Sequence, residues 1–147
     1  MEAIIFVGIQ ATGKSTFYRR RFFDTHVRIN LDMLRTRHRE RILLRACIDA
    51  KQPFVIDNTN TLLAERARYI APARAAGFRI VGYYFQSSLH VALERNRQRS
   101  GNALIPDKGV VMMYRRLQQP RFDEGFDHLY YVAIAASGEF TVREWIE

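Results

Sequence analysis

The sequence predicts an α/β fold in which helices cover both faces of a parallel sheet. An apolar run at residues 3–7 leads directly into a glycine-rich segment at residues 8–15 and then into a helical run. Farther along, short apolar runs alternate with helical ones, the order that builds a parallel sheet through crossover connections. The length of 147 residues suits one ordinary core, so we expect residues 1–147 to form a single domain.

The composition describes a globular and strongly basic chain. Hydrophobic residues make up 48% of it, yet no apolar run approaches the roughly 20 residues of a membrane helix, so we expect no membrane partner. Cys47 stands alone, which excludes an internal disulfide and a cysteine zinc site and favours a cytoplasmic location. The net charge of +8 favours a polyanionic partner, with a solvated basic surface as the alternative.

Residues 8–15 match the pattern of a phosphate-binding loop: glycine, four residues, glycine, lysine, serine. Gly8 and Gly13 let the backbone turn tightly and point its N–H groups at phosphate oxygens. Lys14 is expected to reach the β- and γ-phosphates, and Ser15 to offer its hydroxyl to Mg²⁺. The cofactors predicted are therefore ATP, or another nucleoside triphosphate, and Mg²⁺. The remaining loop positions expected to contact the nucleotide are Gln10, Ala11, Thr12 and Thr16.

The next elements alternate between helix and strand. Residues 16–23 predict a short helix with three arginines on one face and aromatic side chains that we expect in the core, namely Phe17, Tyr18, Phe22 and Phe23. Residues 27–30 predict a strand. Residues 31–50 predict one long helix that begins near Asp32, and its expected apolar side comprises Leu34, Ile42, Leu43, Ala46 and Cys47.

Residues 54–57 form an apolar run that ends in Asp57, as expected of a buried parallel strand that reaches the ligand-binding edge of the sheet. A carboxylate at that edge supports Mg²⁺ or orients groups near the phosphate loop, although Asp57 could also simply terminate the strand or cap a helix. A polar loop at residues 58–60 follows. A helix at residues 61–76 then ends at Gly77.

The second half predicts a lid and an edge hairpin. After a strand at residues 78–85, a basic helix at residues 89–99, a loop at residues 100–106 and a helix at residues 107–119 resemble the arginine lid of a phosphoryl-transfer enzyme, spanning about residues 88–119. An exposed helix face is the alternative for these arginines. Strands at residues 129–135 and 140–145 are expected to form the hairpin, with Trp145 as a packing residue.

These elements favour a P-loop kinase-like parallel sheet with strand order 2-3-1-4-5. The chain is short for a motor, and it lacks the Asn-Lys-x-Asp segment with which GTPases read guanine. The phosphoryl acceptor then becomes the open question.

Several segments resemble the kinase domain of 5′-hydroxyl polynucleotide kinases, and most closely that of the animal polynucleotide kinase-phosphatases. The Asp-Asn-Thr-Asn segment at residues 57–60 is the most discriminating of them, since many families share the phosphate loop. The resemblance covers most of the chain and is carried by residues 13–17, 30–32, 56–60, 66–69, 73–77, 105–106, 111–114, 120 and 124–126.

The resemblance implies an ATP- and Mg²⁺-dependent transfer to the 5′-OH end of DNA or RNA, with a role in nucleic-acid repair. Asp32 matches the general base of the family; the alternative role for Asp32 is that of a helix N-cap. Arg35, one helical turn after Asp32, matches an arginine that holds the acceptor phosphate. Arg95 and Arg99 match lid arginines that face the triphosphate, with Arg99 the better candidate for stabilising the migrating phosphoryl group. The implied acceptor network comprises Asp57, Asn58, Thr59 and Asn60.

One position departs from the family pattern. Leu31 stands where relatives commonly carry an arginine before the catalytic aspartate, so that contact is missing or comes from Arg35 or Arg37. A small-molecule or nucleoside kinase, and a nucleotide-dependent nucleic-acid-binding module, remain the alternatives. No phosphatase or ligase portion accompanies the kinase motifs, which leaves room for a separate phosphatase or ligase partner that the sequence does not identify.

Overall fold

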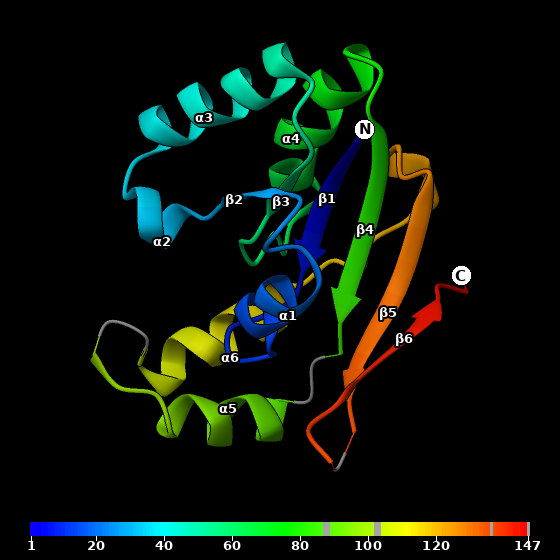
Figure 1. The fold of residues 1–147 in the computed structure, drawn as a ribbon. Helices are drawn as coiled ribbons and strands as arrows, with labels where there is room; N and C mark the ends of the chain where they lie inside the picture. Colours follow the sequence, from blue (N-terminus) through cyan, green and yellow to red (C-terminus); the bar gives the residue numbers. More distant parts are fainter. Residues whose placement is uncertain (87–88, 102–103, 136, 147) are drawn as a thin grey trace.

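The structure is a computed structural model that describes residues 1–86, 89–101, 104–135 and 137–146. Its strands form one sheet in the order β2-β3-β1-β4-β5-β6, visible from left to right in Figure 1. The first five run parallel and β6 runs antiparallel to β5, which confirms the predicted order and edge hairpin. The strands are β1 (Glu2–Val7), β2 (Val27–Ile29), β3 (Phe54–Ile56), β4 (Arg79–Phe85), β5 (His128–Ile134) and β6 (Phe140–Glu144).

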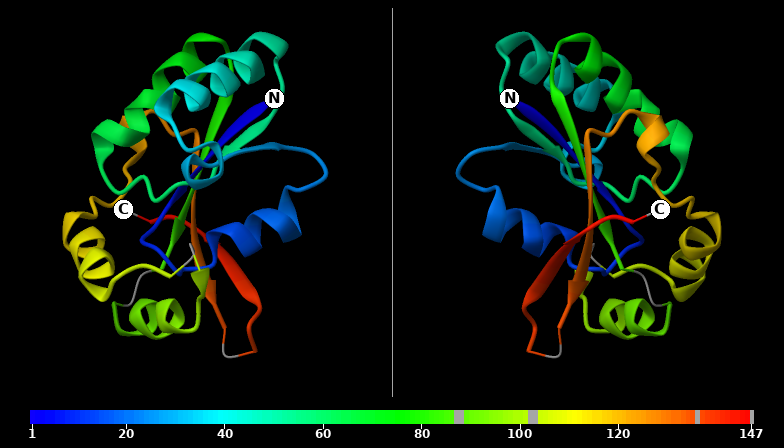
Figure 2. Two further views of the ribbon diagram at one scale, coloured as in Figure 1. Left: turned by 90° about the vertical axis from the view of Figure 1, so that its left-hand side faces the viewer. Right: turned by 90° about the vertical axis from the view of Figure 1, so that its right-hand side faces the viewer.

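Helices cover both faces of the sheet (Figure 2). On one face α1 (Lys14–Arg21) packs Phe17 against Phe6 and Phe85 of the strands. On the other, α3 (Arg37–Ala50) and α4 (Leu63–Ala75) bury the second apolar cluster. The central strands are consequently apolar on both sides, as expected of a parallel sheet.

The two helices expected in the lid region are present and pack on each other below the sheet in Figure 1, as α5 (Leu89–Arg97) and α6 (Asp107–Arg116). Ala92 and Val110 from these helices bury Ile9 of the phosphate loop. Asn96 is fully buried and bonds both the N–H and the carbonyl of Ile105, which fixes the turn between the two helices. Residues 88 and 102–103 of the predicted lid lie outside the described residues.

The prediction of one helix over residues 31–50 is wrong. The chain forms α2 (Leu31–Leu34) and then starts again as α3, because Arg35 adopts a φ of 76° and Thr36 is extended. Thr36 caps the second helix by accepting a hydrogen bond from the N–H of Arg39. Arg35 therefore lies at the break and does not share a helix face with Asp32.

The break also changes which side chains reach the core. Leu44 and Ile48 are buried, whereas Ile42 is 57% exposed and Ala46 is exposed, contrary to the predicted apolar side. In the first helical region Phe23 is 68% exposed, while Phe17, Tyr18 and Phe22 are in the core as predicted. Trp145 packs edge-on against Tyr84 and stacks on Tyr131, so its expected packing role is confirmed.

Candidate active site

The phosphate loop connects β1 to α1 and is shaped by close contacts that exclude side chains. A Cβ added at Gly8 would lie 3.0 Å from Phe85 Cβ, and Gly13 has a φ of 92°. Ala11 also has a positive φ, of 62°, so the loop coils around an open centre. Ile134 and Phe140 of the C-terminal hairpin lie directly behind Gly13.

Lys14 points back into the phosphate loop. Its Nζ donates to the carbonyls of Gly8 at 3.0 Å and Ile9 at 2.7 Å. Burial lowers the pKa of Lys14 to about 8. The negative charges of Asp57 and Asp32 oppose that shift, and the positive charge of Arg99 adds to it. Four charged groups predicted for the site are thus close enough to influence one another.

Ser15 and Asp57 meet as predicted. Ser15 Oγ donates to Asp57 Oδ2 at 3.0 Å, and the Asp57 side chain is only 1% exposed. Arg28 of β2 donates to the same carboxylate oxygen from Nε at 2.8 Å and to Ser15 Oγ from Nη2 at 3.1 Å. The buried carboxylate is thereby compensated by a guanidinium.

The serine and carboxylate also fit Mg²⁺. Among the described residues no group of three or more His, Cys, Asp or Glu side chains is arranged to hold a metal. A hydroxyl and a carboxylate are oxygen ligands of the kind that Mg²⁺ takes, and Mg²⁺ commonly completes its shell with waters and phosphate oxygens.

Lid arginines face the loop. Arg99 Nη1 and Gln10 Oε1 are shielded from solvent and make no hydrogen bond within the described part of the chain. A buried guanidinium nitrogen next to Lys14 is suited to a phosphate oxygen, which would satisfy it. Arg95 lies one turn earlier and lines a cavity of about 250 Å³ between α5, the phosphate loop and β5. The other residues lining that cavity are Ala11, Thr12, Gln86, Val91, Ala92, Val132, Ala133 and Ile134.

Asp32 lies in the first turn of α2, and its side chain is exposed. The helix cap is Asn30, whose Oδ1 accepts from the N–H of Met33 while its Nδ2 donates to the carbonyl of Asp57. Asp32 is thus free of the capping role that was its alternative. The two bonds of Asn30 fix the start of α2 beside the end of β3.

The three residues that follow Asp57 connect parts of the site to one another through hydrogen bonds. Asn58 accepts from the N–H of Leu31 at 2.8 Å and donates to Glu40 at 3.1 Å. The carbonyl of Thr59 accepts from the N–H of Gly8, and Asn60, which is 2% exposed, donates to the carbonyl of Phe6. These contacts tie the loop after β3 to the phosphate loop and to α2.

Sequence reasoning missed Arg28 and a buried polar cluster behind Asn58. Glu40, 1% exposed, accepts hydrogen bonds from Arg37 at 2.8 Å and from the Tyr69 hydroxyl at 3.0 Å. Burial and the charge of Glu40 raise the pKa of Tyr69, so this hydroxyl stays protonated and donates. The alternation Val-Arg-Ile at residues 27–29 was the available signal for Arg28, because it turns the arginine away from the face that buries its neighbours.

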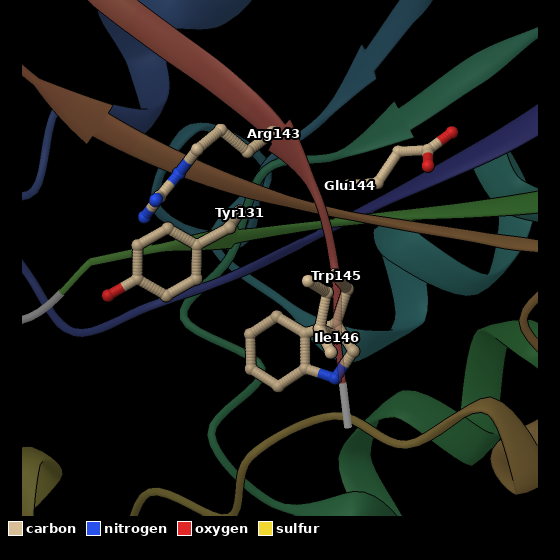
Figure 3. Close-up of a pocket in the computed structure, with 5 residues that line it drawn as sticks. All are labelled: Tyr131, Arg143, Glu144, Trp145 and Ile146. Atoms are coloured by element: carbon tan, nitrogen blue, oxygen red, sulfur yellow. The ribbon is translucent and has the colours of Figure 1, made fainter.

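A larger hollow of about 520 Å³ lies along β5 and β6 and shares no residue with the predicted site. Figure 3 shows its lining, with the guanidinium of Arg143 close to the ring of Tyr131 and the indole of Trp145 nearby. Within the part of the chain that the structure describes, each helix is too short or too polar to traverse a bilayer.

Comparisons with known proteins agree with this geometry. The bifunctional polynucleotide phosphatase/kinase of Schizosaccharomyces pombe is 27% identical over 155 residues, which cover 99% of this chain and 37% of that protein. The chain thus spans little more than a third of the length of this relative.

Solved structures share the fold. A gluconokinase from Sinorhizobium meliloti superposes with a TM-score of 0.63 at 20% identity, covering 91% of this chain and 83% of that one. Kti12 from Chaetomium thermophilum, solved in complex with ADP-AlF3, gives a TM-score of 0.65 at 15% identity and 92% coverage of each chain.

A family model described as an AAA domain matches residues 4–120, a range that begins in β1 and includes the phosphate loop and both lid helices. A loop built to bind phosphates, a sheet of the expected strand order and this match lead to one conclusion: the chain is a P-loop nucleotide-binding domain that belongs to the AAA domain family.

Proposed function

We propose that this protein is a kinase that transfers the γ-phosphate of ATP to the 5′-hydroxyl end of DNA or RNA. The observation that carries the proposal is the exposed carboxylate of Asp32 in the first turn of α2, whose charge opposes the fall in the pKa of Lys14 that burial causes. A nucleotide-binding module has no use for such a group beside the phosphates, whereas a kinase needs one to accept the proton of the attacking hydroxyl.

The donor half is assigned to the phosphate loop and the lid. Lys14 would exchange the carbonyls of Gly8 and Ile9 for phosphate oxygens, and Arg99 would satisfy its buried nitrogen on the γ-phosphate. The cavity of about 250 Å³ beside Arg95 suits the nucleoside, with Val91 and Val132 packing on the base. Mg²⁺ held by Ser15 and Asp57 would neutralise charge on the β- and γ-phosphates.

The acceptor half is assigned to α2 and the start of α3. Asp32 accepts the proton of the 5′-hydroxyl as it attacks, and positioning matters more than basicity because that proton leaves late. Arg35, Arg39 and Arg41 are exposed in the segment that follows Asp32, while Glu40, the acidic residue among them, is buried and paired. A strand of nucleic acid offers the repeated phosphates that such a cluster would bind.

The similarity to the fission yeast phosphatase/kinase supports a polynucleotide over a small acceptor. Against this, Leu31 stands where the related kinases commonly have an arginine, and Arg37 does not replace it, because its guanidinium bonds Glu40 and Tyr69. Arg35, at the break between the helices, is the better candidate for the missing contact.

The proposal is tested by supplying γ-labelled ATP and Mg²⁺ with four acceptors: a 5′-hydroxyl oligonucleotide, the same oligonucleotide already 5′-phosphorylated, a nucleoside and gluconate. We expect label on the 5′-hydroxyl oligonucleotide alone, and we expect raised salt to reduce that transfer because phosphate contacts are screened. Label confined to the nucleoside or gluconate would assign a small-molecule kinase, and ATP binding without any transfer would assign a binding module.

A further inference from the structure

Arg28 occupies the place at which the proposed function puts a metal ion. Its Nε lies 2.8 Å from Asp57 Oδ2 and its Nη2 lies 3.1 Å from Ser15 Oγ. Ser15 Oγ donates to that same carboxylate oxygen at 3.0 Å. The Arg28 guanidinium and the Ser15 hydroxyl therefore meet at one oxygen of Asp57, and Ser15 and Asp57 are the oxygen ligands that Mg²⁺ would use.

The electrostatics of Asp57 explain why a cation is needed there. The carboxylate is 1% exposed, and a charge this buried is costly unless it is paired and hydrogen-bonded. Arg28 supplies both the charge and the bond. A divalent cation at Ser15 would also supply positive charge, and two cations on one carboxylate oxygen repel each other.

The Arg28 side chain has a second contact, with Tyr18, that it can keep when it leaves Asp57. This side chain is 28% exposed, and its guanidinium carbon lies 6.0 Å from the centre of the Tyr18 ring, so it can keep a cation–π contact while it gives up the carboxylate. Tyr18 is itself fixed, because its hydroxyl donates to the carbonyl of His26 at 2.6 Å. The ring belongs to a buried apolar cluster and is therefore a fixed partner for the guanidinium.

We propose that Arg28 is a resident cation that keeps the Ser15–Asp57 pair ordered in the metal-free protein and competes with the divalent cation for Asp57. Arg28 is a positioning residue in this scheme, since it acts on the metal site through Asp57. The scheme rests on the proposed function, because it takes Ser15 and Asp57 as the metal side of the nucleotide site. It implies that the magnesium requirement is set by Arg28.

The test measures ATP binding by calorimetry as a function of Mg²⁺ in the wild type and in Arg28→Gln, which keeps a hydrogen-bond donor and loses the charge. We expect the Mg²⁺ concentration for half-maximal binding to fall about tenfold, the size of a typical coupling between two binding events. Arg79→Gln is the matched control, since Arg79 also leaves a strand to pair with a carboxylate, that of Glu2 at 2.8 Å, and it should change nothing.

A second readout needs no nucleotide. Mg²⁺ alone should raise the melting temperature of Arg28→Gln more than that of the wild type, because the variant leaves Asp57 without its cation. Arg28→Lys covers the case in which the glutamine variant fails to fold. The lysine of this variant keeps the positive charge but lacks the planar guanidinium that bonds Asp57 and Ser15 together. The Mg²⁺ concentration for half-maximal ATP binding should therefore fall by a smaller factor, about threefold.

The outcomes separate the inference from the proposed function. A magnesium requirement that is unchanged or higher in Arg28→Gln or Arg28→Lys overturns the inference, as does an effect of Arg28→Gln that persists in an Asp57→Asn background. If the wild type itself fails to bind ATP at any Mg²⁺ concentration, the proposed function fails first.

Discussion

Single residues in the site differ in how firmly the protein holds them. Asp57 is buried and bonded on both sides, whereas Asp32 is exposed on the first turn of a four-residue helix. That contrast suits their proposed roles, since a metal-side carboxylate benefits from being fixed and a general base has to meet an incoming hydroxyl.

Asp32→Asn is expected to leave ATP affinity within about twofold of the wild type and to lower phosphoryl transfer by roughly 10² or more, the usual scale for a general base. Single-turnover transfer to a 5′-hydroxyl oligonucleotide measures the loss, and calorimetry measures the binding. Asp24→Asn, at an exposed aspartate outside the site, should alter neither quantity. Full transfer by Asp32→Asn would show that another group takes the proton.

Lys14 predicts a pH dependence of stability in the protein free of metal and nucleotide. Burial lowers its pKa in the folded state from 10.5 to about 8, so below pH 8 the folded protein carries a buried charge that the unfolded chain accommodates more easily. The unfolded state binds more protons between pH 8 and 10.5, and stability contributed by this group therefore rises with pH over that window.

The measurement compares urea unfolding of the wild type and Lys14→Met in EDTA at several pH values. As pH rises from 8 to 10.5, the free energy of unfolding of the wild type should increase relative to that of the variant by at most about 3 kcal/mol. A difference between the two proteins that stays constant over this range would show that Lys14 keeps an ordinary pKa in the loop.

At the scale of elements, the strands were the most predictable part of the fold and the helix after β2 the least. The strands β1, β3, β4 and β5 are short runs rich in apolar residues, and this pattern is local. The division into α2 and α3 depends on the contacts of Asn58 with Leu31 and Glu40, which come from a distant part of the chain. Thr36, the N-cap of α3, is the local sequence signal that a second helix begins. A threonine within a helical pattern is easily taken for an ordinary surface residue.

Alanine substitution is expected to change the free energy of unfolding in opposite directions at two glycines, Gly82 in β4 and Gly109 in α6. A Cβ at Gly82 would lie 2.6 Å from Leu129 Cδ2 and 2.7 Å from Phe126 Cε1, both of them buried, so Gly82→Ala should destabilise the protein by about 1–3 kcal/mol. A Cβ at Gly109, in α6, meets no described atom within 4 Å, so Gly109→Ala should stabilise by about 0.5–1 kcal/mol. Chemical denaturation of both variants checks the signs, and a stable Gly82→Ala would mean that the two side chains move aside.

At the scale of the whole molecule, the parallel sheet gathers the site at one edge. The phosphate loop follows β1, Asp32 follows β2 and Asp57 follows β3, so strand ends that are far apart in sequence meet in space. The sequence therefore sufficed to predict which edge of the sheet carries the phosphate loop and the two carboxylates, while the roles of these residues and of the lid arginines stay predictions. It did not suffice for Arg28, or for the inward direction of Asn60, because those depend on which side of a strand or loop the tertiary contacts select.

Arg66 joins distant parts of the chain and predicts a large loss of stability. It is fully buried, bonds Glu124 at 2.7 and 2.9 Å, and also donates to the carbonyls of Asn60 and Gln118. Arg66→Met should cost about 3–5 kcal/mol because it leaves a buried carboxylate unpaired. Urea unfolding measures this cost against Arg45→Met, whose exposed pair with Asp49 should be worth under about 0.5 kcal/mol. Equal losses in the two variants would contradict the burial argument.

The contact between Gly13 and the C-terminal hairpin has a consequence for synthesis. Ile134 and Phe140 lie behind a loop that the ribosome makes more than a hundred residues earlier. Domains form as their parts emerge, but this loop cannot take its final support until β5 and β6 have left the exit tunnel. A nascent chain therefore displays its phosphate-binding residues before the hairpin gives them their finished shape. Nucleotide binding during synthesis would then report that the hairpin has formed.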